Sequence, residues 1–81
     1  MMQASEVEQL VRDSYPDIDV LVETDGYHYQ LRAIGVEFEG LNKVKRQQLI
    51  YACLNAHIVD GTIHAVVMQT YTPSEWESRD A

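Results

Sequence analysis

The sequence predicts an α+β fold with the element order α-β-β-α-β-α, in which a three-stranded sheet carries its helices on one face. Three observations predict it. Asp25-Gly26, a strong signal for a two-residue hairpin turn, joins two stretches of strand-like sequence. Those stretches alternate apolar and polar residues, so the pair offers one apolar face for helices to cover. The helical stretch that follows is long enough to carry the chain back to a parallel third strand.

The first helix is expected to begin at Ser5, because Ser5 and Glu8 have the spacing of a capping box. Val7 and Val11 recur at helical spacing and form part of its apolar side. Pro16 marks the end of the helix, since proline cannot continue it.

Two strands should pair around Asp25-Gly26, with Thr24 and Tyr27 flanking the turn. In this register one face of the hairpin is wholly apolar, and the other is mostly polar with opposite-charge pairs across the strands. A slip of one residue would exchange the two faces. The apolar pairs are Val22 with Tyr29, Val20 with Leu31 and Ile18 with Ala33, and the other pairs are Glu23 with His28, Leu21 with Gln30 and Asp19 with Arg32.

A second helix is expected from Asn42 to about Val59, and Gly61 can take the left-handed conformation that follows many helices. The stretch from Thr62 to Tyr71 is rich in β-branched and aromatic residues and predicts a third strand. This strand can join the hairpin antiparallel or, through the helix, as a parallel neighbour. The length of the second helix favours the parallel arrangement.

A short last helix should begin after Thr72, because Thr72, Pro73 and Glu75 suit the N-cap, the first helical position and the capping glutamate. It carries Trp76, and a loose tail is expected after it. The 81 residues fit a single domain over residues 1–81, with an ordered core from about 5 to 78.

Composition narrows the class of protein. The formal net charge of -7 argues against nonspecific nucleic-acid binding, which depends on lysine and arginine. The first residues do not resemble a secretory leader, and no stretch approaches the ~20 apolar residues that span a bilayer. A cytoplasmic protein without a membrane segment is expected.

Three cations, Lys43, Lys45 and Arg46, lie in the first turn of the second helix, where the helix dipole already presents positive charge. One interpretation is a solvated basic turn that costs a few tenths of a kcal/mol. The other is a binding site for an acidic partner surface or for an anionic ligand such as glutathione.

Histidines are the second group of candidates. His64 falls within the third predicted strand, and periodicity does not decide whether it faces the helices or the open side of the sheet. His28 lies beside the hairpin turn on the polar face. On that face the two could supply half of a metal or iron–sulfur site, to be completed by a second protein because the chain has a single cysteine. The alternative is that both are structural, as we expect for His57 near the end of the second helix.

No pattern in the sequence predicts an enzyme. Cys53 lies in the most apolar part of the second helix, where a buried small side chain is expected rather than a reactive thiol. Gly35 and Gly40 do not have the spacing of a phosphate-binding loop, and no Ser/His/Asp motif is present.

Several segments together resemble the BolA family, and most closely its short bacterial IbaG-like branch. Their order and spacing match over nearly the whole chain. The segments are Phe38-Glu39-Gly40 with Val44-Lys45-Arg46-Gln47-Gln48, and Ile63-His64-Ala65 with Tyr71-Thr72-Pro73 and Glu75-Trp76.

This resemblance implies a class II KH-like domain that forms a heterodimer with a monothiol glutaredoxin. The two proteins would share a 2Fe-2S cluster held by a glutaredoxin cysteine, a glutathione thiol and side chains of this chain. His64 matches the carboxy-terminal histidine ligand of the family, and His28 is the candidate for a second ligand. Lys43, Lys45 and Arg46 would lie in or near the surface that faces glutaredoxin. The isolated chain is expected to hold no cofactor and to be a monomer or a weak dimer.

The alternative is a nucleic-acid-binding transcriptional regulator that uses the same basic turn. KH-like folds bind single strands through a Gly-x-x-Gly loop, and the corresponding segment here, Glu39 to Lys43, lacks the second glycine. The net charge also disfavours this function.

Overall fold

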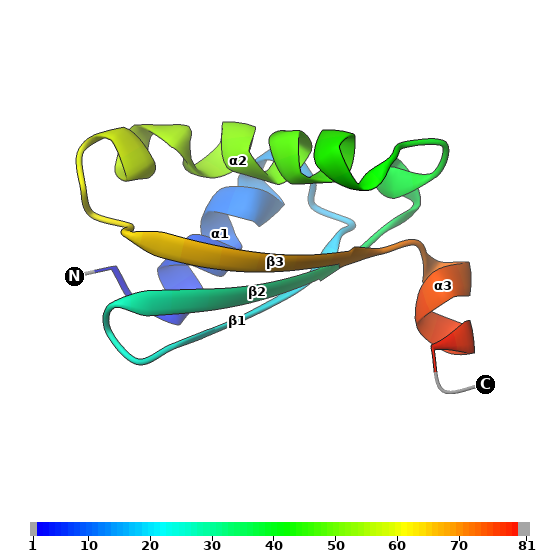
Figure 1. The fold of residues 1–81 in the computed structure, drawn as a ribbon, viewed down its shortest axis with the longest axis horizontal. Coiled ribbons are helices and arrows are strands. Elements are labelled where there is room, and N and C mark those ends of the chain that lie inside the picture. The colour runs from blue at the N-terminus through cyan, green and yellow to red at the C-terminus, as the bar shows by residue number, and fades with distance from the viewer. Residues whose placement is uncertain (1, 80–81) are drawn as a thin grey trace.

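The predicted order of elements is confirmed by the structure, a computed structural model that describes residues 2–79. An additional 3-10 turn lies between the second strand and the second helix (Figure 1). The elements are α1 (Ala4–Ser14), β1 (Asp19–Thr24), β2 (His28–Ile34), η1 (Val36–Phe38), α2 (Lys43–Val59), β3 (Ala65–Tyr71) and α3 (Pro73–Ser78). The loose tail predicted after α3 falls largely on residues 80 and 81, outside the described residues.

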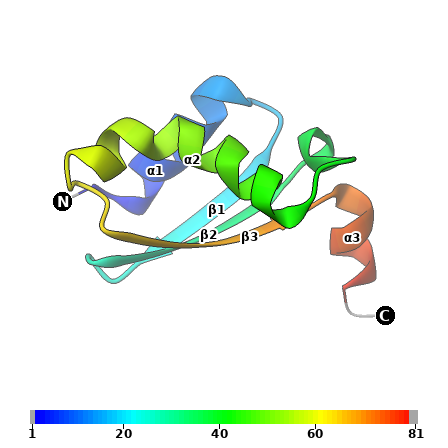
Figure 2. The same ribbon diagram turned by 45° about the horizontal axis from the view of Figure 1, so that its top comes forward.

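The three strands form one mixed sheet in the order β1-β2-β3. β1 and β2 are antiparallel, and β2 and β3 are parallel, so α2 is the predicted crossover. α1 and α2 lie on the same side of the sheet, as expected, whereas α3 lies beyond the strand ends (Figures 1 and 2). The other face of the sheet is left without a helix across it.

The hairpin is confirmed, but its predicted register is wrong by two residues. Thr24 pairs with Tyr29, so the turn contains the four residues 25–28 rather than Asp25-Gly26 alone. A shift of two residues leaves every side chain on its predicted face, and Val20, Val22, Tyr29, Leu31 and Ala33 are all buried. The predicted charge pairs are lost, because Glu23 lies opposite Gln30 and Asp19 opposite Ile34.

The predicted start of α1 is also wrong. The N-cap is Gln3 rather than Ser5, and the backbone N–H of Gln3 donates to the Glu6 carboxylate at 2.9 Å. Glu8, expected to close the capping box, instead accepts a hydrogen bond from the backbone N–H of Val22 at 2.9 Å. A tertiary contact with β1 therefore takes the glutamate that the local pattern assigned to the cap.

The other helix ends follow the sequence. Asn42 caps α2 by accepting from the backbone N–H of Lys45 at 2.9 Å, and Gly61 has the positive φ of 83° expected after the helix. Thr72 and Glu75 cap α3 reciprocally, through bonds of 2.9 and 3.2 Å.

β3 is shorter than predicted, beginning at Ala65, so His64 precedes the strand instead of lying in it. Met68 is buried and Val66 packs against the core, whereas Val67 is exposed on the open face. The residues that alternate with His64 therefore face the helices and not the open side, and His64 itself is exposed because it precedes the strand.

A hydrophobic core fills the space between the helices and the sheet. Val7 and Val11 of α1, and Ile50 and Leu54 of α2, are completely buried there. Tyr29 extends from β2 through this core, and its hydroxyl donates to the carbonyl of Met2 at 2.6 Å. The buried residues of α1 and α2 therefore pack both helices against one face of the sheet. The candidate site residues lie at the two ends of the sheet.

Truncation of a side chain in this core should lower the stability of the fold. The Leu54→Ala variant should lower the free energy of unfolding by about 2–5 kcal/mol, because Leu54 is fully buried and a cavity would replace it. Val44→Ala removes apolar atoms from an exposed position of the same helix and should change it by less than about 1 kcal/mol. Urea unfolding measures both, and similar losses in the two variants would contradict this core assignment.

Candidate functional site

The predicted site residues lie at two opposite ends of the molecule. His28 begins β2 and pairs with Ala65, the residue after His64, so the two histidines lie at one end of the sheet. Lys43 and Lys45 lie at the start of α2, a helix of 17 residues. Such a helix is about 25 Å long at 1.5 Å per residue. The structure therefore does not bring the basic turn to the histidines as the single surface that the resemblance implied.

Tyr27 links the two histidines. Its ring stacks on that of His64, with centroids 4.9 Å apart and an angle of 12° between planes. It meets His28 edge-on, with centroids again 4.9 Å apart. All three side chains are exposed. Sequence reasoning treated Tyr27 only as a turn residue. Its position directly before His28 in the hairpin was the one feature of the sequence that could have indicated a role at this site.

Asp25 determines how His28 is presented. Its Oδ1 accepts hydrogen bonds from the backbone N–H groups of Tyr27 and His28, at 2.9 and 2.8 Å, and its Oδ2 lies 3.2 Å from Nδ1 of His28. The bonds from His28 and Tyr27 lower the pKa of Asp25 from 3.8 to about 2. An ionised carboxylate only accepts hydrogen bonds, so Nδ1 of His28 carries the hydrogen and the neutral ring keeps its lone pair on Nε2.

A carboxylate that holds one imidazole nitrogen and leaves the other available is the usual support of a histidine metal ligand. Among the described residues, the donors that remain available at this end are the two imidazoles, because Asp25 is engaged by the hairpin turn and by His28. Within the described part of the chain no three residues among His, Cys, Asp and Glu are grouped closely enough to hold a metal ion. The residues present fit a metal centre that a second molecule completes, and they do not fit one that this chain builds alone.

Cys53 does not contribute a third donor at the histidine end. It lies midway along α2, half-buried against the core, and its Sγ donates to the carbonyl of Leu49 at 3.6 Å. Burial raises the pKa of the Cys53 thiol. Both features agree with the structural role predicted from the sequence.

Arg46 has a structural role that the sequence did not reveal. Its Nη1 and Nη2 donate to the Glu75 carboxylate at 2.6 and 3.3 Å, and its Nε donates to the carbonyl of Leu41 at 2.8 Å. Only 13% of its side chain is exposed. Hydrogen bonding by Arg46 is the largest cause lowering the pKa of Glu75 to about 2. Arg46 therefore ties the start of α2 to α3 and is largely withdrawn from the basic turn.

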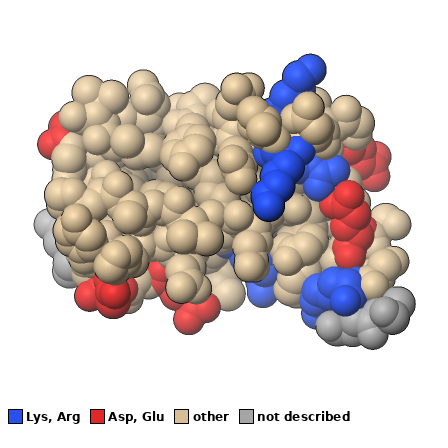
Figure 3. All heavy atoms as spheres, viewed as in Figure 1, with Lys and Arg blue, Asp and Glu red and all other residues tan. Residues whose placement is uncertain are grey.

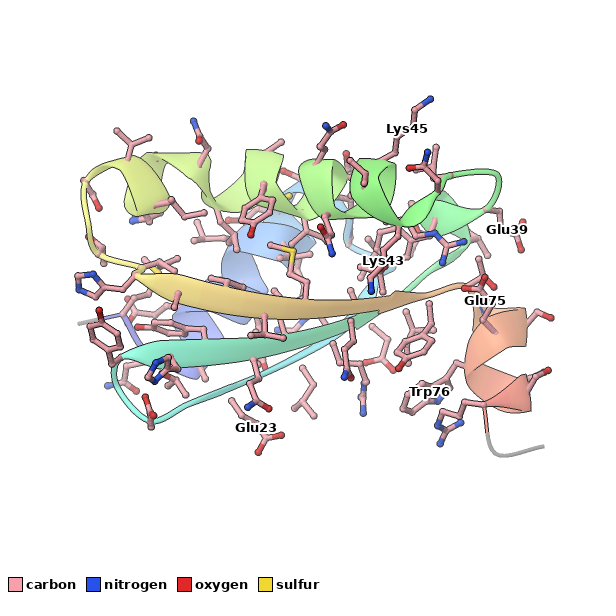
Figure 4. All side chains as sticks on the ribbon, viewed as in Figure 1. Glu23, Glu39, Lys43, Lys45, Glu75 and Trp76 are labelled. Atoms are coloured by element: carbon pink, nitrogen blue, oxygen red, sulfur yellow. The ribbon has the colours of Figure 1, made fainter. Side chains whose placement is uncertain are left out.

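The side chains of the two remaining cations of this turn point in different directions. Lys43 points from α2 towards β3, whereas Lys45 points away from the sheet (Figure 4). In the view of Figure 3 the basic residues gather at the end that carries the start of α2 and α3. The predicted basic turn is thus reduced to one lysine directed at the sheet and one directed at solvent.

A groove that sequence reasoning missed lies beside Lys43. It runs between the start of α2, the end of β3 and α3, and its volume is about 660 Å³. Its lining includes Leu41, Lys43, Met68, Thr70, Tyr71 and Glu75. No sequence signal identifies it, because it depends on how three separate elements meet.

The open face of the sheet has a smaller hollow of about 250 Å³. Leu21 and Val67 are exposed there, and the Arg32 guanidinium lies 4.6 Å from the centre of the Trp76 ring. Trp76 points from α3 towards this side of the sheet (Figure 4). The last helix therefore borders both the groove and the open face.

Comparison with known proteins connects this fold to a family. The BolA-like protein model matches residues 5–75. Acid stress protein IbaG of Escherichia coli K12 is 39% identical over 75 residues, which cover 93% of this chain and 89% of that protein. The structure of a BolA protein homologue from Coxiella burnetii has a TM-score of 0.84 and 31% identity, covering 95% of this chain and 99% of that one. A third relative, the DNA-binding transcriptional regulator BolA of Haemophilus influenzae, is 32% identical over 53 residues, or 65% of this chain and 50% of that protein.

The chain belongs to the BolA-like protein family. The resemblance found in the sequence is thereby confirmed, including its likeness to IbaG. The curated relatives are described as a stress protein and a transcriptional regulator, and neither description is that of an enzyme. The class II KH likeness stays a prediction. Among the described residues no helix is both long and apolar enough to cross a membrane.

Asp25 can be tested through the tautomer of His28. In Asp25→Asn the new amide can donate to Nδ1, so the hydrogen of the neutral ring should move to Nε2, which imidazole ¹⁵N shifts report at alkaline pH. Asp19→Asn, at an exposed position of the same hairpin, should leave the tautomer unchanged.

The same variant tests the depressed pKa of Asp25. A carboxyl whose pKa falls on folding from 3.8 to about 2 stabilises the fold above pH 4 and loses that contribution as the pH drops towards 2. Asp25→Asn should therefore show a weaker decline of stability over this interval, measured by thermal unfolding at stepped pH. An unchanged decline would rule out the proposed hydrogen bonding.

Proposed function

We propose that this protein is a partner of a monothiol glutaredoxin and shares a 2Fe-2S cluster with it through His64 and His28. The observation that carries the proposal is the pair of exposed imidazoles that both contact Tyr27, with Nε2 of His28 left available by Asp25. A histidine pair that is not joined by a third metal-binding residue within residues 2–79 suits a centre completed by another molecule.

The remaining ligands would be thiolates, from a glutaredoxin cysteine and from glutathione. Imidazole ligands in place of thiolates raise the reduction potential of a 2Fe-2S cluster. His64 and His28 would therefore make the shared cluster easier to reduce than a centre held by thiolates alone.

Tyr27 contacts both imidazoles. Each imidazole centroid is 4.9 Å from that of Tyr27, and the Tyr27 ring stacks on His64. We assign Tyr27 a positioning role, in which its ring sets the direction of His64 as Asp25 sets that of His28. A site built this way is held by contacts within the hairpin and needs no deep pocket.

A titration with cluster-loaded monothiol glutaredoxin tests the proposal. Under anaerobic conditions the visible circular dichroism of the cluster should change and saturate at one chain per glutaredoxin. The change should be lost in His64→Ala and diminished in His28→Ala, because each variant removes one imidazole donor.

His57→Gln is the matched control, since His57 is the one remaining histidine of the sequence and lies within α2. It should behave as the unmodified protein. No spectral change with the unmodified chain would reject the glutaredoxin partnership. An equal change in all four proteins would retain the partner and reject both histidines as ligands.

Transcriptional regulation through nucleic acid has less support. The Haemophilus relative is named as DNA-binding. In this chain, however, Arg46 is bound to Glu75, and the other two cations of the turn, Lys43 and Lys45, point in different directions. The net charge of -7 further opposes binding to a polyanion.

A further inference from the structure

The two edge strands of the sheet, β1 and β3, differ in whether side chains bind their outward-facing backbone groups. At the edge of β1, Glu8 accepts from the backbone N–H of Val22 at 2.9 Å, and Arg12 donates to the carbonyl of Val20 at 3.4 Å. Glu8 and Arg12 are themselves 3.6 Å apart as an ion pair. Side chains of α1 thus occupy the backbone groups of β1 that another strand would use, a common protection of edge strands.

The edge of β3 lacks this protection. The carbonyl of Tyr71 faces β2, where it accepts from the backbone N–H of Gly35 at 3.0 Å. Since backbone groups alternate in direction along a strand, those of Met68 and Thr70 point away from β2. No side chain of residues 2–79 forms a hydrogen bond with them, and both residues line the 660 Å³ groove.

The groove borders enough of β3 for an added strand to pair with. Residues 68–71 of β3 line it, a stretch of about 13 Å at 3.3 Å per residue, which four residues of an extended peptide match. Leu41 and Tyr71 supply apolar lining on either side. An extended peptide could therefore pair with β3 through its backbone while alternate side chains contact the groove, which is a known mode of peptide recognition.

The charged residues around the groove indicate which kind of segment binds there. Lys43 points from α2 towards β3 beside this groove, and Glu75, the acidic residue of the lining, is held by Arg46 (Figure 4). A second copy suits the groove less well: its acidic strand β1, with Asp19 and Glu23, has its free edge already bonded to side chains of α1, and its β3 contains no acidic residue. A partner with acidic residues alternating along an extended segment suits the groove better.

We propose that the free edge of β3 binds an extended acidic segment of a partner protein as a fourth strand, with Lys43 pairing with one of its carboxylates. This site lies at the end of the molecule opposite the histidines. It is independent of the proposed glutaredoxin function, and the two partners could be bound together.

The test uses the full chain labelled with ¹⁵N and an N-acetylated, C-amidated hexapeptide of alternating valine and aspartate. Titration should shift the amide signals of Met68 and Thr70, with a Kd below about 1 mM. Hydrogen exchange at these amides should slow in the complex. A peptide N-methylated at alternate positions keeps its charges, cannot pair with the edge, and should not bind.

Charge reversal at two matched positions distinguishes binding in the groove from nonspecific electrostatic attraction to the protein. Lys43→Glu should weaken binding at least about fivefold, because attraction becomes repulsion at the groove. Lys45→Glu makes the same change in the same helical turn but points away from the sheet, and should leave the affinity within about twofold. Acidic residues are favourable in the first turn of a helix, so both variants should fold.

Other outcomes would overturn the proposal. Equal losses in the two lysine variants, or undiminished binding of the N-methylated peptide, would show charge attraction without strand pairing. Shifts at Met68 and Thr70 that depend on protein concentration alone would assign the edge to a second copy. Binding of a single-stranded oligonucleotide but not of the peptide, with dependence on Lys43, would assign the groove to nucleic acid.

Discussion

β2 and β3 pair in parallel, and this pairing determines where α2 and both proposed sites lie. A chain that leaves β2 must travel back along the whole sheet before a parallel β3 can begin, and α2 makes this return. The start of α2 therefore lies beside the end of β3, and the loop after α2 lies beside the hairpin turn. Lys43 is consequently placed at the groove, and His64 is placed against Tyr27.

Two ends with different chemistry follow from this arrangement. The hairpin end presents imidazoles and an aromatic ring, oriented by the ionised Asp25. The other end presents an open strand edge beside a lysine, and the bond between Arg46 and Glu75 fixes α3 as one wall of the groove. Both proposed sites are built on the surface from rigid elements, so neither needs an enclosed pocket.

The sequence was sufficient for the element order and for the two faces of the hairpin, since a periodicity of two survives a register shift of two residues. It was insufficient where long-range contacts compete with local patterns. Glu8 completes a capping box in the sequence but binds β1 in the fold, and Arg46 looks like part of a cationic cluster until its partner Glu75 is seen. His64 was selected by family resemblance, and the structure adds its neighbour Tyr27, which no motif indicated.

In the proposed complex the histidine end, and not the basic turn, meets glutaredoxin and its cluster. Amide spectra of the ¹⁵N-labelled chain, recorded with unlabelled glutaredoxin and a reduced, paramagnetic cluster, locate the cluster on this chain, because the unpaired electron broadens signals from nearby residues. We expect broadening at residues 25–28 and 62–66, with the signals of residues 40–46 preserved. Broadening centred on residues 40–46 would contradict it and would place the cluster at the opposite end of α2.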